Sequence, residues 1–199
     1  MNDPQTWQRR RPQLAPVMIP LLVLLVVGAT MLALALWART TVVILVRHAE
    51  SGVSETGDPD LSPAGEARAR VLGPFLEDAL AGRGVDFLYA TDLRRAQQTA
   101  ASIANQFKVP INLLGSADWA RLANRVRREH RGSTVAVVGG PQDLQGLSRR
   151  LLNVPLVLDE GDYSAILVVT VPSLGAPRAL RLHYGTLPEA GPPSEKTTR

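Results

Sequence analysis

The sequence contains no cysteine among its 199 residues. This excludes disulfides, cysteine-ligated metals, iron–sulfur clusters and thiol nucleophiles. Histidine is also scarce, with three residues, and none of them has the spacing of a paired metal-ligand motif, so we expect no metal and no cofactor. Net positive charge is small outside the N-terminus: residues 1–39 hold four arginines and one aspartate, which is +3 of the total +4. Because the rest lacks a basic stripe, we expect no nucleic-acid partner.

One long apolar segment, residues 14–38, contains no charged side chain. At 1.5 Å per residue a helix of this length exceeds the roughly 30 Å hydrocarbon core of a bilayer, which predicts a transmembrane anchor. Three arginines, Arg9 to Arg11, precede it and only Arg39 follows closely. The positive-inside rule then makes residues 1–13 a basic cytoplasmic N-terminus and puts the following domain on the outer side, periplasmic or extracellular. A cleaved signal peptide is the alternative, with Ala33-Leu34-Ala35 as its cleavage site.

Beyond the anchor, short β-branched runs alternate with amphipathic segments over residues 40–185. We expect strands at 41–46, 85–89, 134–138, 165–171 and 179–184, and helices at 63–79, 92–107, 119–126 and 141–152. Ser62 and Pro63 form an N-cap and first-turn pair, and Gly73-Pro74 predicts a kink or a break in the helix. Alternating strands and helices predict an α/β layer structure with a mostly parallel sheet, whose ligands bind at the carboxyl ends of the strands. Residues 186–199, rich in proline, glycine and threonine, are predicted to be a disordered tail.

The reactive side chains follow two of these strands. Arg47 and His48 come directly after the first one, and Arg95 lies in the first turn of the helix after the second. Neutral imidazole is a good nucleophile near neutral pH, arginine matches phosphate oxygens bidentately, and a helix N-terminus attracts anions. Taken singly, each residue has a structural explanation as well. Together they indicate phosphoryl chemistry.

At this point the sequence resembles the histidine phosphatase superfamily, with its phosphoglycerate-mutase-like fold, and especially the small bacterial phosphohistidine-phosphatase-like branch. The resemblance rests on Arg47-His48-Ala49-Glu50, on Asp58-Pro-Asp-Leu-Ser-Pro-Ala-Gly65, on Asp92-Leu-Arg-Arg-Ala-Gln-Gln-Thr-Ala100, and on the strand 134–139 and the ending 182–185. It implies a three-layer α/β sandwich with a mostly parallel central sheet, preceded here by one transmembrane helix. It also implies metal-independent hydrolysis of a phosphate ester or phosphohistidine through phospho-His48, with Arg47 and Arg95 binding the transferred group. The implied partner is a phosphorylated small molecule or phosphoprotein.

One departure from the family pattern lies after the strand at 134–138. The family carries a second pocket histidine there, whereas this chain has Gly140. Losing a charge-assisted hydrogen bond costs about 1.5–3 kcal/mol, and losing an acid–base group costs about 10²–10⁴ in rate. The alternative function is therefore a catalytically degenerate member that binds a phosphorylated ligand or partner protein without turnover.

The general acid is not assigned from the sequence. Glu50, Asp92 and Asp118 are candidates, although Glu50 could orient the loop after the first strand, Asp92 reads as a helix N-cap and Asp118 could open the third helix. The remaining histidines, His130 and His183, are expected to be structural. The arginine run from Arg121 to Arg131 is expected to be a solvated helix end.

Overall fold

The computed structural model describes residues 15–37, 39–53, 57–115, 118–153 and 161–185. The chain divides into two compact units, residues 1–38 and residues 39–199. The predicted cytoplasmic N-terminus 1–13 and disordered tail 186–199 lie outside the described residues.

The first unit contains one helix, α1 (Ala15–Trp37), whose large apolar side chains from Met18 to Leu34 are exposed. Across the described parts of the chain, no helix is apolar over a length that could cross a bilayer. The transmembrane helix predicted over 14–38 is therefore not supported by the structure.

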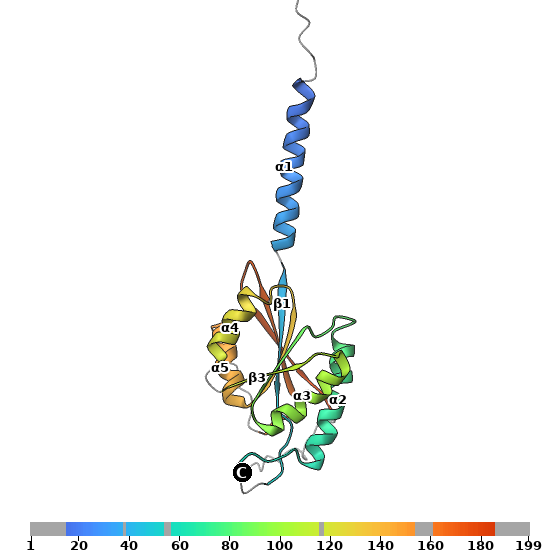
Figure 1. The fold of residues 1–199 in the computed structure, drawn as a ribbon, viewed down its shortest axis with the longest axis vertical. Helices are drawn as coiled ribbons and strands as arrows, with labels where there is room; N and C mark the ends of the chain where they lie inside the picture. Colours follow the sequence, from blue (N-terminus) through green and yellow to red (C-terminus); the bar gives the residue numbers. More distant parts are fainter. Residues whose placement is uncertain (1–14, 38, 54–56, 116–117, 154–160, 186–199) are drawn as a thin grey trace, which may run out of the picture. The chain divides into compact units, whose positions relative to one another are not determined.

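The second unit is an α/β domain in three layers (Figure 1). Helices α2 and α3 cover one face of a central sheet, and α4 and α5 cover the other. The elements are β1 (Thr40–Arg47), α2 (Pro63–Ala79), β2 (Phe87–Thr91), α3 (Arg94–Phe107), β3 (Ile111–Leu114), α4 (Trp119–Arg128), β4 (Thr134–Gly139), α5 (Pro141–Leu152), β5 (Ala165–Pro172) and β6 (Arg178–His183).

The sheet is mixed, with the strand order β3-β2-β4-β1-β5-β6. The first four strands in that order are parallel, whereas β5 pairs antiparallel with β1, and β6 pairs antiparallel with β5. The prediction of a mostly parallel sheet is thus correct for this set of four, and β3 was not predicted. It has four residues and leaves Asn112 and Leu113 exposed, so it lacks the continuous apolar run of a central strand.

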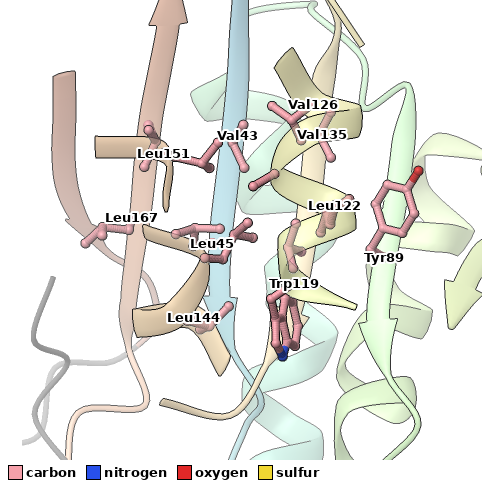
Figure 2. Close-up of a cluster of buried hydrophobic side chains, with 14 of the residues drawn as sticks. Val43, Leu45, Tyr89, Trp119, Leu122, Val126, Val135, Leu144, Leu151 and Leu167 are labelled. Carbon is pink, nitrogen blue, oxygen red and sulfur yellow. The ribbon is translucent and has the colours of Figure 1, made fainter. Parts of the chain in front are cut away.

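Burial on both faces explains the composition of β1. Val43 and Leu45 belong to the core between the sheet and helices α4 and α5, whereas Ile44 and Val46 belong to the core on the α2 and α3 side. Successive strand side chains point to opposite faces, so a strand inside two layers needs apolar residues throughout. Figure 2 shows the first of these cores, in which Trp119 lies at the edge closest to the end of β4.

The loop after β1 is held against the start of α2. Ser62 caps that helix by accepting a hydrogen bond from the Gly65 N–H at 3.1 Å, as predicted, and its own N–H donates to the Glu50 carbonyl at 2.9 Å. A Cβ on Gly65 would lie 2.1 Å from the Glu50 carbonyl oxygen, so this close approach requires glycine. Pro74 does not break α2, which continues from Pro63 to Ala79.

Candidate active site

The candidate site lies where the parallel strands β1, β2 and β4 end. Arg47 is in register with Gly139, and the His48 N–H donates to the Gly139 carbonyl at 3.1 Å. These bonds fix the backbone of His48 at the carboxyl edge of the sheet, beside the first residues of α5. This is the edge at which an α/β fold binds its ligands.

The His48 ring is held in one tautomer by its two neighbours. Nδ1 lies 3.0 Å from the Ala49 carbonyl oxygen, which can only accept, so Nδ1 carries the proton. Nε2 in turn accepts a hydrogen bond from Arg95 Nε at 3.2 Å. The unprotonated nitrogen, the one with a nucleophilic lone pair, therefore faces the arginine.

Electrostatics keep this imidazole neutral. His48 is 7% exposed, and burial lowers its pKa below the ordinary value. The charges of Arg95 and Arg47 lower the pKa further, while the bond to Ala49 and the charge of Asp143 oppose the shift. A neutral, oriented imidazole between two guanidinium groups suits attack on an anionic phosphoryl group.

Arg95 reaches His48 because α3 starts three residues after β2 ends. Thr99, one turn further along α3, is buried and uses its hydroxyl twice: it donates to the Arg95 carbonyl at 2.7 Å and accepts from the Ala49 N–H at 3.0 Å. Its hydroxyl thus joins the helix that carries Arg95 to the loop that carries His48.

Arg47 is 6% exposed, and its guanidinium carbon lies 4.0 Å from the centre of the Tyr163 ring. A cation over an aromatic face is attracted by the ring quadrupole, so Tyr163 orients this guanidinium. Tyr163 comes from the segment before β5, more than a hundred positions away in the chain. Nothing in its local sequence identifies it.

The carboxylates proposed from the sequence as general acids have other partners. Glu50 accepts hydrogen bonds from Arg68 Nε at 2.8 and 3.0 Å and pairs with Arg68 Nη2 at 2.7 Å. Burial is the largest single effect and pushes the pKa of Glu50 upward, but the hydrogen bonds from Arg68, a backbone hydrogen bond and the charges of Arg68 and Arg47 together hold the pKa below its ordinary value. Asp118 precedes α4 and pairs with Arg121 at 2.9 Å without capping the helix through its side chain.

Asp92 is not the N-cap of α3, contrary to the prediction, since Leu93 occupies that position and makes no side-chain cap bond. The carboxylate of Asp58 instead accepts from the Arg94 N–H, with both oxygens at 3.1 Å. Asp60 pairs with Arg94 Nη2 at 3.0 Å. The segment before α2 therefore binds the first residue of α3. A pattern in the local sequence could not show this contact, because the two segments are far apart in the chain.

A carboxylate that the sequence analysis did not single out lies beside Gly140. Asp143, in the first turn of α5, accepts a hydrogen bond from Trp119 Nε1 at 2.9 Å through Oδ1. A Cβ built on Gly140 would lie 3.3 Å from Asp143 Oδ2. The charge of Asp143 also raises the pKa of His48, so the two groups share one electrostatic environment. The sequence offered one signal for Asp143, namely its position in the first turn of a helix that begins at the carboxyl edge of the sheet.

The other two histidines do not join this site. His130 is buried beneath Phe87, and its Nε2 lies 2.9 Å from the Tyr89 hydroxyl oxygen. His183 lies on β6, with Nε2 3.2 Å from Asp162 Oδ2. Within the described residues, no group of three His, Cys, Asp or Glu side chains could hold a metal ion.

Comparison with known proteins shows a family and a fold that this chain resembles. Residues 43–116 match the family model of the histidine phosphatase superfamily, branch 1. No curated protein sequence matches the chain. The fold is similar to that of the protein histidine phosphatase SixA complexed with tungstate, with a TM-score of 0.60 and 17% identity over 71% of this chain and 96% of that one.

Two further solved structures share the fold. One is a protein from Agrobacterium tumefaciens described as a phosphohistidine phosphatase SixA, with a TM-score of 0.55 and 18% identity over 73% of this chain and 99% of that one. The other is described as an alpha-ribazole-5'-P phosphatase from Escherichia coli, with a TM-score of 0.55 and 16% identity over 72% of this chain and 96% of that one.

Proposed function

This chain belongs to the histidine phosphatase superfamily, and we propose that it hydrolyses a phosphate ester or phosphohistidine through a phosphohistidine intermediate on His48. The observation that carries the proposal is the Nε2 atom of His48, an unprotonated ring nitrogen held 3.2 Å from Arg95 Nε. The proposed reaction needs no metal. The substrate class follows the relatives of the same fold, since one of them is a protein histidine phosphatase.

In the first step, His48 Nε2 attacks phosphorus and the bond from phosphorus to the leaving group breaks. Arg47 and Arg95 hold the oxygens of the transferred group and stabilise the charge that spreads over them in the transition state. In the second step, water attacks the phosphorus of phosphohistidine. The P–N bond breaks, inorganic phosphate leaves and the electron pair returns to Nε2.

Asp143 is the carboxylate we assign to proton transfer. In its acid form it gives a proton to the leaving oxygen or nitrogen, and the resulting carboxylate then takes a proton from the attacking water. Glu50 and Asp118 are less suited, since each already pairs with an arginine.

The test is hydrolysis of an aryl phosphate by the full chain in neutral detergent, with a chelator present. We expect turnover, acid-labile phosphate trapped on the protein, and loss of both in His48→Ala. His183→Ala is the matched control, because it removes an exposed histidine from β6 and should leave the rate within about twofold. Equal rates for wild type and His48→Ala would refute the hydrolase proposal.

Gly140 favours a second candidate, a degenerate member that binds a phosphorylated ligand or partner protein without turnover. Its backbone caps α5 without a side-chain bond, at a helix N-terminus that attracts anions. Phosphate binding by a wild-type protein that shows no His48-dependent hydrolysis would support this candidate.

We further propose that residues 14–38 anchor the domain in a membrane, with residues 1–13 cytoplasmic and residues 40–185 on the periplasmic or extracellular side. Support comes from the absence of charged residues in 14–38 and from the exposed apolar side chains of α1. Carbonate extraction and protease accessibility in intact cells test the two parts separately. Release by carbonate would refute the anchor, and protection of the domain in intact cells would refute the orientation.

A further inference from the structure

Trp119 lies where the core meets the candidate active site. It is 7% exposed and belongs to the core between the sheet and helices α4 and α5. A Cβ built on Gly139 would lie 3.5 Å from the indole Cη2, so the ring packs beside the end of β4. Figure 2 shows the indole nitrogen at the end of the ring that points away from Leu122. That nitrogen, Nε1, donates to Asp143 Oδ1 at 2.9 Å.

The topology brings these two side chains together. Helix α4 follows β3 and α5 follows β4, and both strands are parallel to β2, so the two helices begin at the same carboxyl edge of the sheet. Trp119 is the first residue of α4, and Asp143 lies in the first turn of α5. The bond between them therefore joins two helix starts beside the candidate active site.

The indole N–H makes the two oxygens of Asp143 unequal. An indole nitrogen can only donate a hydrogen bond, so Oδ1 must be the acceptor whether the carboxyl group is ionised or protonated. In the acid form the proton therefore lies on Oδ2. In the carboxylate form Oδ2 is the oxygen left to accept a proton from another group.

Oδ2 is also the oxygen on the side of the reacting groups. A Cβ built on Gly140 would lie 3.3 Å from Oδ2, and that oxygen is the one described atom outside the neighbouring residues that such a Cβ would meet within 4 Å. Gly140 follows Gly139, whose carbonyl oxygen accepts from the His48 N–H at 3.1 Å. Oδ2 therefore borders open space next to the backbone of the nucleophile.

We propose that Trp119 is a positioning residue: by holding Oδ1 of Asp143, its N–H makes Oδ2 the atom that gives a proton to the leaving oxygen and takes one from the attacking water. This inference rests on the proposed function, because it needs Asp143 as the group that transfers the proton. It also narrows the substrate class. Esters whose leaving oxygen departs poorly without a proton, such as phenyl and alkyl phosphates, are the substrates that depend on this pair.

A purely structural role for the bond makes a different prediction. A buried indole N–H needs an acceptor, and the amide oxygen of an asparagine at position 143 would serve as well as a carboxylate oxygen. Loss of the N–H would then lower stability and affect all phosphate esters alike, since it would act through the amount of folded protein. A positioning role affects substrates according to their leaving group.

The experiment compares kcat/KM for phenyl phosphate and para-nitrophenyl phosphate, with the full chain in neutral detergent and a chelator present. The nitrophenolate ion leaves without a proton, and kcat/KM reports the steps up to phosphorylation of His48. We expect Asp143→Asn to lower kcat/KM for phenyl phosphate at least about tenfold more than for the nitrophenyl ester, and Trp119→Phe to do so at least about threefold more. The ratio of the two values does not depend on the fraction of folded protein.

Leu122→Ala is the matched control, because it removes buried volume from the same helix and leaves the bond to Asp143 in place. It should leave the ratio within about twofold of wild type. If Trp119→Phe shows no thermal transition, benzothienylalanine at position 119 replaces it, since this residue has the shape of tryptophan with sulfur in place of the N–H.

The outcomes separate this inference from the proposed function. A changed ratio in Asp143→Asn with an unchanged ratio in Trp119→Phe would overturn the inference alone, as would a change in Leu122→Ala as large as that in Trp119→Phe. An unchanged ratio in both site variants, with turnover still dependent on His48, would overturn the inference and the assignment of Asp143. Equal rates for wild type and His48→Ala would refute the hydrolase proposal and this inference with it.

Discussion

Restoring a histidine at Gly140 is the sharpest test of the candidate site. The backbone there is extended, with φ −75° and ψ 163°, a conformation that histidine adopts without strain. The new Cβ would lie 3.3 Å from Asp143 Oδ2, so that carboxylate must move by a few tenths of an ångström.

The magnitude follows from the interaction that is added. A hydrogen bond from a charged donor to the phosphoryl group contributes about 1.5–3 kcal/mol. Each 1.36 kcal/mol in the transition state is a factor of ten in rate, so we expect Gly140→His to raise kcat/KM for an aryl phosphate by roughly ten- to a hundredfold. The assay is initial-rate hydrolysis at pH 6–8 in detergent with a chelator, beside wild type.

Gly140→Asn is the matched control, since it adds a polar side chain at the same backbone position without a charge. It should change kcat/KM by less than about threefold. If Gly140→His folds, as judged by its thermal transition, and shows no gain, or if Gly140→Asn gains as much, a missing cation at this position does not limit the reaction.

The remaining predictions concern the geometry around the nucleophile. The neutral form of His48 is the active one, and its pKa lies below the ordinary value of 6.5. In a pH–rate profile, the decrease of kcat/KM toward acid should therefore have its midpoint below pH 6.5. A midpoint above pH 6.5 would contradict the assignment. Thr99→Val removes the acceptor of the buried Ala49 N–H, so the free energy of unfolding should drop by about 1–3 kcal/mol and kcat should fall as well. A loss of stability with unchanged kcat would argue against a positioning role for Thr99. Gly65→Ala should lower the free energy of unfolding by at least about 1–3 kcal/mol, because its Cβ would lie 2.1 Å from a carbonyl oxygen. Gly146→Ala, in α5 with nothing within 4 Å of a new Cβ, should be neutral or stabilising in the same denaturation experiment, and equal losses would show that close approach is not the cause.

Part of the candidate site could be predicted because its signals are local. Arg47 and His48 end a buried β-branched strand, and Arg95 lies in the first turn of a helix. Each position follows from a short-range pattern, and the α/β alternation puts strand ends at a common edge. The limits of this reasoning appear at Asp92, which is a favourable capping residue by type. Asp58, from a distant segment, accepts the hydrogen bond of the Arg94 N–H at the start of α3. Local propensity cannot predict that contact.

Three features were decided only when distant segments packed together. Asp143 contacts Trp119 across α4 and α5, and Tyr163 covers Arg47 from the segment before β5. β5 pairs antiparallel with β1, on the side of β1 away from β4, and this pairing is a property of the assembled sheet.

The sequence by itself determined the layered α/β class, the two reactive strand ends and the absence of thiol chemistry, because residue type and spacing control local conformation and available functional groups. Only the tertiary structure decided the tautomer of His48 and the partners of Glu50, Asp58 and Asp143. Those properties depend on distances and burial between residues far apart in the chain, which take definite values only after the layers have packed.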